Sequence, residues 1–202
     1  MITIAVFNSK GGAGKSTLSI HFGVCAAYDK ATALLDADPQ GTLQTWARKR
    51  TLDAPAVMPV TAGNLSAQLA KLKARGVALA IVDCPPYITA ESSLLVRDAD
   101  FVVVPVQPLM PDLEGCKKAV EIIKSTGRPF AFVINRAPSR APEIAQAQEE
   151  LAALGEVCPI VIGDRRSFYR ALASGQSVAE FDSDSAASKE AAALYEWILS
   201  KI

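Results

Sequence analysis

The sequence predicts an α/β fold, a doubly wound and mostly parallel sheet with helices on both faces. Short runs rich in Val, Ile, Leu and Ala alternate with segments of helical pattern along the whole chain, and this alternation is typical of right-handed βαβ units. Most of the apolar runs are continuous, as expected of strands that helices cover on both sides. The polar motifs follow directly after strands, where such sheets bind ligands.

The predicted elements can be placed in order along the chain. The predicted strands, each a short apolar run, are 2–7, 31–36, 57–60, 78–83, 101–105, 129–134 and 157–162. The predicted helices are 15–28, 40–50, 64–75, 90–97, 112–125, 142–154, 166–174 and 185–201. The segment 137–142, Ala-Pro-Ser-Arg-Ala-Pro, is expected to be a loop because prolines punctuate it. With no internal repeat and no linker, we expect one domain, residues 1–202.

The composition favours a folded chain. Half of the 202 residues are hydrophobic and the formal net charge is zero, which is unlike the composition of disordered proteins. No apolar run approaches the ~20 residues that cross a bilayer, and the N-terminus lacks the features of a secretory signal, so we expect a cytoplasmic protein. A neutral chain gives no general case for nucleic-acid binding, which would have to come from a local patch.

The cysteines and the single histidine carry no recognisable site. The four cysteines are scattered, with no Cys-x-x-Cys pair and no Cys/His cluster, at Cys25, Cys84, Cys116 and Cys158. We expect them to be reduced thiols rather than metal ligands. His21 lies in the first predicted helix and is expected to be structural.

The most informative stretch joins the first strand to the first helix. It reads Phe7-Asn8-Ser9-Lys10-Gly11-Gly12-Ala13-Gly14-Lys15-Ser16-Thr17. Glycines here let backbone N–H groups approach an anion closely, and the helix dipole favours negative charge at its N-terminus. In such a loop Lys15 can reach the β- and γ-phosphates of a nucleotide, and the Ser16 hydroxyl is placed to ligate Mg²⁺. The alternative is an ordinary strand-to-helix loop.

One position of this loop departs from the usual Gly-x-x-x-x-Gly-Lys-[Ser/Thr] pattern. Ser9 stands where the first glycine would fall, and an extra lysine, Lys10, opens the loop instead.

Two more motifs place carboxylates at strand ends. Asp36 ends the second strand and Asp38 follows it within Leu34-Leu35-Asp36-Ala37-Asp38-Pro39-Gln40-Gly41. Two carboxylates beside a phosphate loop suit Mg²⁺ organisation and the orientation of an attacking water; alone, the pair could be helix-capping acids. In Ala80-Ile81-Val82-Asp83-Cys84-Pro85-Pro86, an apolar run ends in Asp83, a Walker B pattern whose acid reaches Mg²⁺. Strings of this kind are also common by chance.

A fourth motif ends the predicted strand 129–134. Asn135 follows that strand directly, with Arg136 next to it. The amide of Asn135 could hydrogen-bond the edge of a purine, and the alternative is a turn-forming asparagine.

Together, Lys10 to Thr17, Asp36-x-Asp38-Pro39-Gln40-Gly41 and Asp83-x-Pro85-Pro86 resemble the ParA/MinD family of deviant-Walker ATPases. The likeness is greatest to the short ParA proteins that segregate plasmids and chromosomes or position cytoplasmic cargo, and it covers nearly the whole chain. The resemblance implies a P-loop fold and a homodimer that forms when ATP is bound, with two nucleotides sandwiched between the subunits. It also implies Mg²⁺ as cofactor, ADP as product and slow turnover, stimulated by a ParB-like activator or centromere-binding protein.

The resemblance also implies roles for individual residues. Lys10 matches the signature lysine that reaches the partner subunit's nucleotide, and Lys15 holds the β/γ-phosphates within the loop formed by Gly11, Gly12, Ala13 and Gly14. Ser16 binds Mg²⁺ with support from Asp36 and Asp83, and Thr17 contacts the α-phosphate region. Asp38, also placed near the metal, matches the acid that orients the attacking water. The adenine base is implied to lie against Asn135, Arg136, Gly163 and Asp164.

Non-specific DNA binding is a further expectation. Family members bind DNA through basic residues of the C-terminal region, where this chain has Arg165, Arg166 and Arg170. Arg166 and Arg170 lie four apart and share a helix face, so each would contact phosphates without reading bases. Further basic residues could add to the patch, namely Lys117, Lys118 and Arg140. An ordinary solvated basic face is the alternative. On this interpretation the ATP-bound protein associates with the nucleoid.

Other functions are weaker alternatives. Because the first strand begins at residue 2, we expect no N-terminal helix-turn-helix and no sequence-specific operator binding. A MinD-like membrane role would need a basic amphipathic final helix. Here the charges of that helix balance, which favours packing on the domain. A metabolic P-loop enzyme related to dethiobiotin synthetase would need a substrate lobe, and a binding module with an inactive ATPase site fits poorly with the intact Lys10, Lys15 and Asp38.

Overall fold

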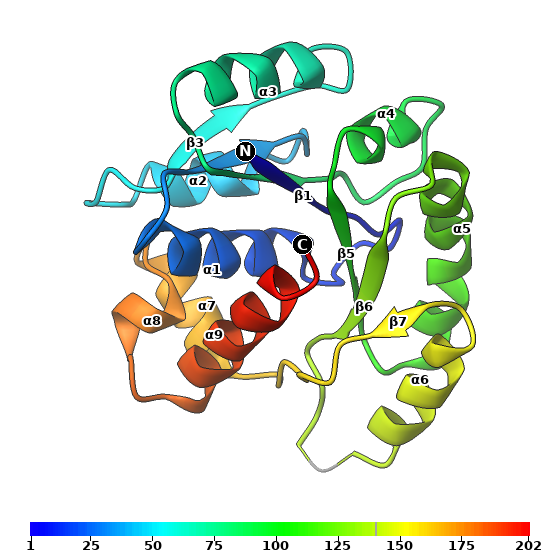
Figure 1. Cartoon of the computed structure of the whole chain (residues 1–202). Coiled ribbons are helices and arrows are strands. Elements are labelled where there is room, and N and C mark those ends of the chain that lie inside the picture. Colours follow the sequence, from blue (N-terminus) through cyan, green and yellow to red (C-terminus); the bar gives the residue numbers. More distant parts are fainter. Residues whose placement is uncertain (140) are drawn as a thin grey trace.

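The computed structural model describes residues 1–139 and 141–202, and within them seven parallel strands form one sheet (Figure 1). Their order in the sheet is β3-β2-β4-β1-β5-β6-β7. The strands are β1 (Ile2–Val6), β2 (Thr32–Asp36), β3 (Ala56–Pro59), β4 (Leu79–Asp83), β5 (Phe101–Val106), β6 (Phe130–Ile134) and β7 (Glu156–Val157). The helices are α1 (Lys15–Ala27), α2 (Thr42–Ala47), α3 (Leu65–Ala74), α4 (Ser92–Arg97), α5 (Met110–Thr126), α6 (Glu143–Ala152), α7 (Arg166–Ala173), α8 (Val178–Phe181) and α9 (Ala186–Leu199). The predicted doubly wound fold is confirmed.

One predicted strand is shorter in the structure, and one helix was not predicted. The seventh strand was expected over 157–162, but β7 ends at Val157, because Pro159 has no N–H to continue the ladder. The chain still follows β6, since the backbone N–H groups of Cys158 and Ile162 donate to β6 carbonyls at 2.8 and 2.9 Å. The short helix α8 was not predicted, although its Ser177-x-x-Glu180 capping box is visible in the sequence.

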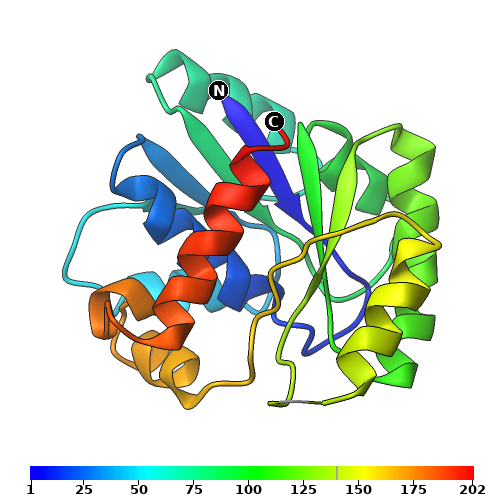
Figure 2. The ribbon, with the colours of Figure 1, turned by 60° about the horizontal axis from the view of Figure 1, so that its bottom comes forward.

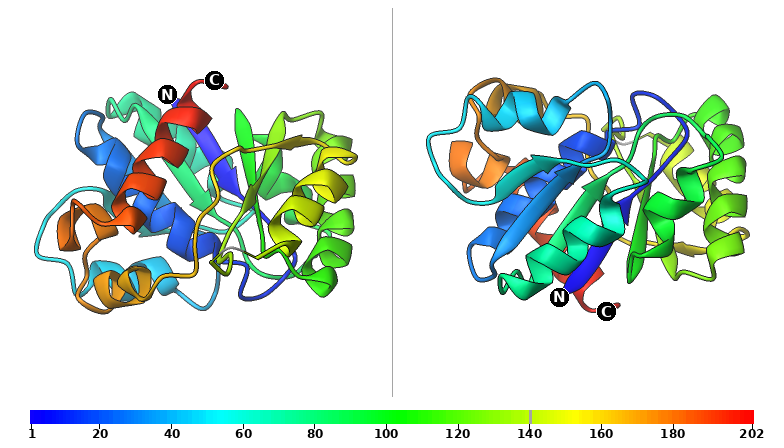
Figure 3. Two further views of the ribbon diagram at one scale, coloured as in Figure 1. Left: turned by 90° about the horizontal axis from the view of Figure 1, so that it is seen from below. Right: turned by 90° about the horizontal axis from the view of Figure 1, so that it is seen from above.

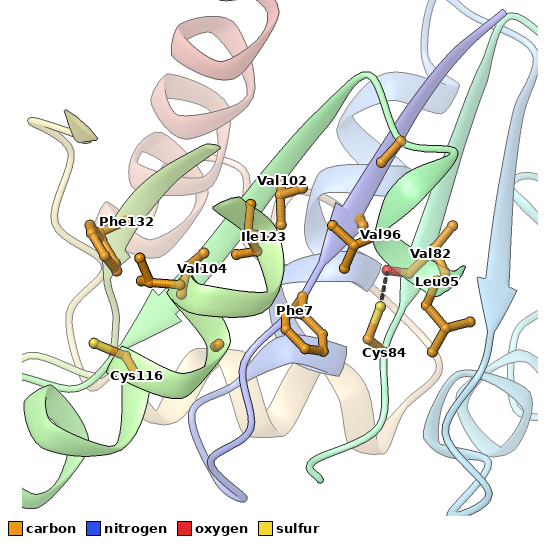
Figure 4. Packing of buried hydrophobic residues seen from close by; sticks show 14 of the residues in the cluster. Phe7, Val82, Cys84, Leu95, Val96, Val102, Val104, Cys116, Ile123 and Phe132 are labelled. Carbon is orange, nitrogen blue, oxygen red and sulfur yellow. Dashed lines mark hydrogen bonds between the residues drawn. The ribbon is translucent and has the colours of Figure 1, made fainter. Parts of the chain in front are cut away.

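Alternate strand residues feed two separate cores, one on each face of the sheet. Ala5 and Phe7 point into the layer formed by α3, α4, α5 and α6, while Ile4 and Val6 point into the layer formed by α1, α2, α7, α8 and α9. Figure 4 shows the first of these layers, with Phe7 among side chains of β4, β5 and α5. Because both faces are covered, the strands are apolar throughout, as the sequence pattern indicated.

The strand order brings the motifs to one edge. β1 lies between β4 and β5, and β4 is bordered on its other side by β2. The ends of β2 and β4 are register neighbours, so Asp36 pairs with Asp83, and Asp83 in turn pairs with Val6 before the Gly-rich loop. The carboxyl ends of β1, β2, β4 and β6 therefore surround one region, at the point where the strand order reverses.

The final helix α9 packs on the domain, as predicted. Its apolar residues Ala187, Ala191, Leu194, Tyr195 and Ile198 are all buried, and Figure 2 shows the helix lying along the α1 face of the sheet. Among the described residues, no helix has the length and apolarity that crossing a membrane requires. The four cysteines are free, and three of them are buried.

The single histidine joins α1 to the α7–α8 region, which agrees with a structural role. His21 is 1% exposed, and its Nδ1 accepts a hydrogen bond from the backbone N–H of Val178 at 3.2 Å. Its ring meets that of Phe168 edge-on at 5.0 Å. The imidazole is therefore held in its neutral form inside an apolar layer.

This burial predicts an acid sensitivity. Burial lowers the pKa of His21 to about 3, whereas it is about 6.5 in an unfolded chain. Below pH 6.5 the unfolded state therefore binds a proton that the folded state excludes, so stability falls as the pH falls towards about 3. From about pH 7.5 to about pH 5, this group alone should lower the free energy of unfolding by about 2 kcal/mol.

The control is His21→Gln, whose unfolding lacks this contribution. Asp83 acts in the opposite direction, because burial raises its pKa to about 7. The relevant quantity is therefore the difference between wild type and variant, measured by urea unfolding at both pH values. A difference that is the same at the two pH values would contradict the prediction.

Candidate functional site

The Gly-rich loop is shaped by a close approach to β6. Gly14 has φ +89°, and a Cβ atom placed on it would lie 2.1 Å from Nδ2 of Asn135. That amide donates a hydrogen bond to the carbonyl of Ala13 at 2.8 Å. Only glycine meets both demands at position 14, one on the backbone conformation and one on space. Asn135 thus supports the loop from behind, a contact that residue type alone did not predict.

A second support holds the loop at Gly12. Its carbonyl accepts a hydrogen bond from Nε2 of Gln107, at the end of β5, at 2.8 Å, and a longer one from Nη1 of Arg136 at 3.4 Å. Gln107 was not predicted as a site residue. Nothing in the local sequence marks it, because its role follows from β5 lying beside β1.

A cavity of about 350 Å³ opens above this loop, within the range of small-molecule sites. Four predicted regions converge on it: the Gly-rich loop, the Asp38 loop, the end of β6 and the loop before α7. The lining residues are Gly11, Gly12, Gly14, Lys15, Ser16, Thr17, Asp38, Gln40, Thr42, Pro86, Asn135, Arg136, Gly163, Asp164, Arg165, Phe168 and Tyr169. Of the residues predicted for nucleotide, metal or catalysis, Lys10, Ala13, Asp36 and Asp83 are not part of this lining.

Lys15 points into the loop. Its side chain is buried, and Nζ donates to the carbonyl of Lys10 at 3.1 Å. Burial lowers its pKa, while the carboxylates of Asp83 and Asp38 favour its charged form. The ammonium group is therefore held where an incoming anion would replace a backbone carbonyl as its partner.

Asp36 and Asp83 are both buried and only partly satisfied. Asp36 Oδ2 accepts from the backbone N–H of Gln44 at 3.1 Å, and Asp83 Oδ1 accepts from the Ser19 hydroxyl at 3.3 Å. The other oxygens, Asp36 Oδ1 and Asp83 Oδ2, have no hydrogen-bond partner. Burial raises the pKa of Asp36, and raises that of Asp83 to about 7.

These orphaned oxygens fit a nearby cation. Over residues 1–139 and 141–202, no three or more His, Cys, Asp or Glu side chains form a ready metal cage. Mg²⁺ does not need one, because it is commonly held by one or two protein oxygens together with phosphates and water. The hydroxyl of Ser16, which lines the cavity, and the two carboxylates are a donor set of that kind.

Asp38 lies at the cavity wall. It is 8% exposed, and its Oδ1 accepts a hydrogen bond from the backbone N–H of Gln40 at 3.0 Å. The cavity is therefore lined by a carboxylate as well as by the Lys15 ammonium group.

The far end of the cavity is closed by a polar trio that includes an unpredicted residue, Tyr169. The Tyr169 hydroxyl donates to Asp164 Oδ1 at 3.2 Å, and Arg136 Nε lies 3.7 Å from the same oxygen. The Arg136 guanidinium lies 5.7 Å from the centre of the Tyr169 ring. Arg136 has φ +53°, unusual outside glycine. The trio forms a wall suited to a flat base, and it arises from contacts distant in sequence.

Lys10 faces a different direction from Lys15. Its Cδ lies against Gly115 of α5, where a Cβ atom placed on the glycine would be 3.6 Å away. Its charge is close enough to oppose the rise that burial causes in the pKa of Asp112.

The predicted DNA-contacting arginines divide into two kinds. Arg165 pairs with Glu190, with 3.0 Å from Nε to Oε1, and so has an internal partner. Arg166 and Arg170 are exposed on α7. Of the predicted additions, Lys117 pairs with Glu114 at 2.9 Å, Lys118 is exposed on α5, and Arg140 lies outside the described residues.

Comparisons with known proteins agree with this geometry. The family model described as "CobQ/CobB/MinD/ParA nucleotide binding domain" matches residues 4–179. The chain is 32% identical over 185 residues to the maintenance of carboxysome distribution protein A of Halothiobacillus neapolitanus, which covers 87% of this chain and 86% of that protein.

Solved structures show the same fold. The apo McdA protein of Cyanothece superposes with a TM-score of 0.84 at 17% identity, covering 98% of this chain and 99% of that one. An ATP complex of a variant of Cyanothece McdA gives a TM-score of 0.80 at 17% identity, with coverages of 99% and 96%. At these identities the likeness concerns the fold alone.

The loop geometry predicts that Gly14→Ala strongly weakens nucleotide binding. The added methyl group would collide with the Asn135 amide at 2.1 Å and strain a backbone with φ +89°, so the loop must move away from β6. We expect ATP affinity to fall on the order of 100-fold, equivalent to about 3 kcal/mol, measured by titration with a fluorescent ATP analogue. Gly63→Ala is the matched control, because the nearest atom to its Cβ is 4.0 Å away. Wild-type affinity in Gly14→Ala would refute this account of the loop.

Proposed function

The chain belongs to the CobQ/CobB/MinD/ParA family of nucleotide-binding domains, and we propose that it is a ParA-type ATPase that positions cargo on DNA. In this proposal residues 1–202 form one ATPase domain. It forms an ATP-dependent sandwich dimer, binds DNA without sequence preference in that state, and hydrolyses ATP to ADP and phosphate slowly until a partner protein accelerates it. The observation that carries the proposal is the cavity, which joins the Lys15 loop, Asp38 and the polar trio at Arg136.

Phosphoryl transfer requires positioning and charge neutralisation more than covalent chemistry. The backbone N–H groups of Gly12 to Thr17 bind the phosphates, and the buried Lys15 neutralises charge on the β- and γ-oxygens. Asp38 orients the attacking water in line with the γ-phosphate. The described site offers no histidine as a strong general base, which fits slow turnover.

Ser16, with Asp36 and Asp83 behind it, would hold Mg²⁺. The ion, when bound, neutralises charge that builds on the phosphate oxygens. Asp83 stabilises this arrangement only as a carboxylate, and the adjacent Lys15 charge favours that form against the effect of burial.

The proposed dimer uses Lys10 in trans. Its side chain lies on α5 rather than in its own cavity, so it is free to reach the nucleotide of a facing subunit. A cation supplied only on association couples hydrolysis to assembly, as an arginine finger does.

The names of the relatives suggest which cargo the protein positions. One of them is named for maintaining carboxysome distribution, which supports a protein-cluster cargo, and plasmid or chromosome cargo is the other choice. The activator would be a ParB-like or centromere-binding protein, or its equivalent on the cargo. The ATP-bound dimer would act in the cytoplasm on the nucleoid.

The sandwich dimer predicts a specific behaviour for Asp38→Ala. Losing the water-orienting carboxylate should stop hydrolysis while leaving the phosphate loop intact, so ATP accumulates in the dimer. On size-exclusion chromatography with saturating ATP and Mg²⁺, we expect the variant to elute as a dimer and the same variant with ADP as a monomer. A variant that stays monomeric with ATP would exclude the sandwich model.

The DNA proposal predicts salt-sensitive binding through α7. Replacing both exposed arginines, Arg166→Gln with Arg170→Gln, should weaken binding of the ATP-bound protein to unrelated duplexes about equally, because the contacts are to phosphates. Fluorescence anisotropy with duplexes of different sequence measures this effect. If the wild-type protein with a non-hydrolysable ATP analogue shows no salt-sensitive DNA binding, the DNA part of the proposal fails.

A further inference from the structure

The end of α2 carries a basic run that packs beside α7. The residues are Arg48, Lys49 and Arg50, at and after the end of the helix. The turn that follows α7 rests directly on them, because a Cβ atom placed on Gly175 would lie 2.5 Å from the carbonyl carbon of Lys49. Figure 3 shows α2 and the α7–α8 segment side by side in both views. Segments 130 residues apart in the sequence thus form one surface.

Arg50 clamps the two segments together. Its guanidinium pairs with Glu180 at 2.6 Å, and the two side chains are only 5% and 11% exposed. It also donates to the carbonyl of Gly175 at 3.2 Å and lies 4.8 Å from the centre of the Trp46 ring. Trp46 in turn donates its indole N–H to the carbonyl of Gln176 at 3.2 Å. A buried, bidentate pair of this kind fixes geometry, so α2 and α7 keep a defined relation.

The two residues before Arg50 are exposed and do not take part in the clamp. Arg48 and Lys49 are both exposed, and the Arg48 guanidinium donates a hydrogen bond to the hydroxyl of Thr45 at 2.9 Å. In the part of the chain that the structure describes, neither of them forms an ion pair, and the same holds for Arg166 and Arg170 of α7. Four uncompensated cations therefore stand on two clamped helices.

The surface between these helices is connected to the nucleotide cavity. A cleft of about 450 Å³ separates α2 from α7, with Lys49 on one wall and Leu172 on the other. It shares Gln40, Thr42 and Tyr169 with the cavity above the Gly-rich loop. Gln40 lies two residues after Asp38, and α2 begins at Thr42. The segment that borders the phosphates is therefore the segment that carries Arg48 and Lys49.

From this arrangement we propose that Arg48 and Lys49 form, with Arg166 and Arg170, one binding surface for the phosphate backbone of duplex DNA. The proposal rests on the function proposed above and extends it to a second element, α2. Because the Arg50 clamp fixes α2 against α7, the four cations keep one arrangement. Gln40 and Thr42 connect this surface to the proposed nucleotide site.

The chemistry of the surface favours a DNA backbone over a membrane. Lipid-binding faces combine basic residues with exposed large apolar side chains. On α7 the exposed aromatic residue is Tyr169, whose hydroxyl is bonded to Asp164. Phe181 is exposed on α8, and the exposed Tyr28 and Leu52 line a separate pocket with Arg50 and Glu180 rather than the cleft that Lys49 borders. Cations of this kind bind polyanions by counterion release, independently of sequence.

The test compares the DNA affinity of a variant that loses two charges near the end of α2 with that of a variant that loses two charges on α3. Arg48→Gln with Lys49→Gln removes two charges from the proposed surface, and Lys71→Gln with Lys73→Gln removes two exposed charges from α3, on the other face of the sheet. Each protein is saturated with a non-hydrolysable ATP analogue and Mg²⁺, and its affinity for a random-sequence duplex is measured by anisotropy over a range of salt concentrations. Nucleotide affinity and melting temperature are measured alongside.

We expect the α2 pair to lower DNA affinity by about tenfold or more, and to reduce the slope of log K against log salt by roughly two per protomer. The α3 pair should leave both unchanged, and Arg48→Lys with Lys49→Arg, which keeps the charges, should bind as the wild type does. Nucleotide affinity should be unaffected in all of them.

Two outcomes distinguish a failure of this inference from a failure of the proposed DNA binding. If the Arg166/Arg170 pair abolishes DNA binding while the α2 pair matches the α3 control, this inference is wrong and the proposed function stands. If the wild-type protein itself binds no DNA in the nucleotide-bound state, the DNA part of the proposed function fails and the inference fails with it.

Discussion

The site depends on one close approach, the backbone of Gly14 against the side chain of Asn135. It ties the Gly-rich loop, which follows β1, to the end of β6, two strands away in the sheet. Without it the loop would have only Gln107 and a long contact to Arg136 to hold Gly12. Because Arg136 follows Asn135 directly, the strand end that supports the Gly-rich loop also supplies the polar trio at the cavity, which we propose contacts the base. The distance between the two ends of the cavity is therefore set by the sheet.

In the site without a ligand, the charge of Lys15 lies near carboxylates of opposite charge, but two carboxylate oxygens lack hydrogen-bond partners. Lys15 is buried with Asp83 and Asp38 as the nearest charges, and its own hydrogen bond goes to a loop carbonyl. Two carboxylate oxygens remain unpartnered behind it, and each such orphaned group costs about 1–3 kcal/mol. Native structures keep buried polar groups without partners mainly at functional sites, where a bound ligand supplies the missing partner. A nucleotide with its counterion supplies the partners that both kinds of group lack.

Much of this could be predicted from the sequence, because the relevant signals are local. Apolar runs, glycines and strand-end acids are read within a few residues, and they predicted the fold, the loop and the position of Asp83. Contacts between distant segments could not be predicted in this way. Nothing near Asn135 shows that its amide supports Ala13, and nothing near Tyr169 shows that it faces Asp164. Pro159 was visible, yet its effect on β7 depends on the ladder with β6.

The arginines show most clearly what the sequence could not predict. An arginine that forms an ion pair lies one or two positions from an arginine that is exposed. Arg165 is paired with Glu190 while Arg166 is exposed, and Arg50 is paired with Glu180 while Arg48 is exposed. In both places the paired arginine fixes a turn, while Arg48 and Arg166 form no ion pair with any residue that the structure describes. An exposed cation on a freely moving segment loses conformational entropy when it binds a phosphate, whereas one on a clamped helix has lost most of it already. The buried Arg50–Glu180 pair and the partly exposed Arg165–Glu190 pair therefore pre-organise the exposed charges of α2 and α7. They do so at the two segments that border the cavity.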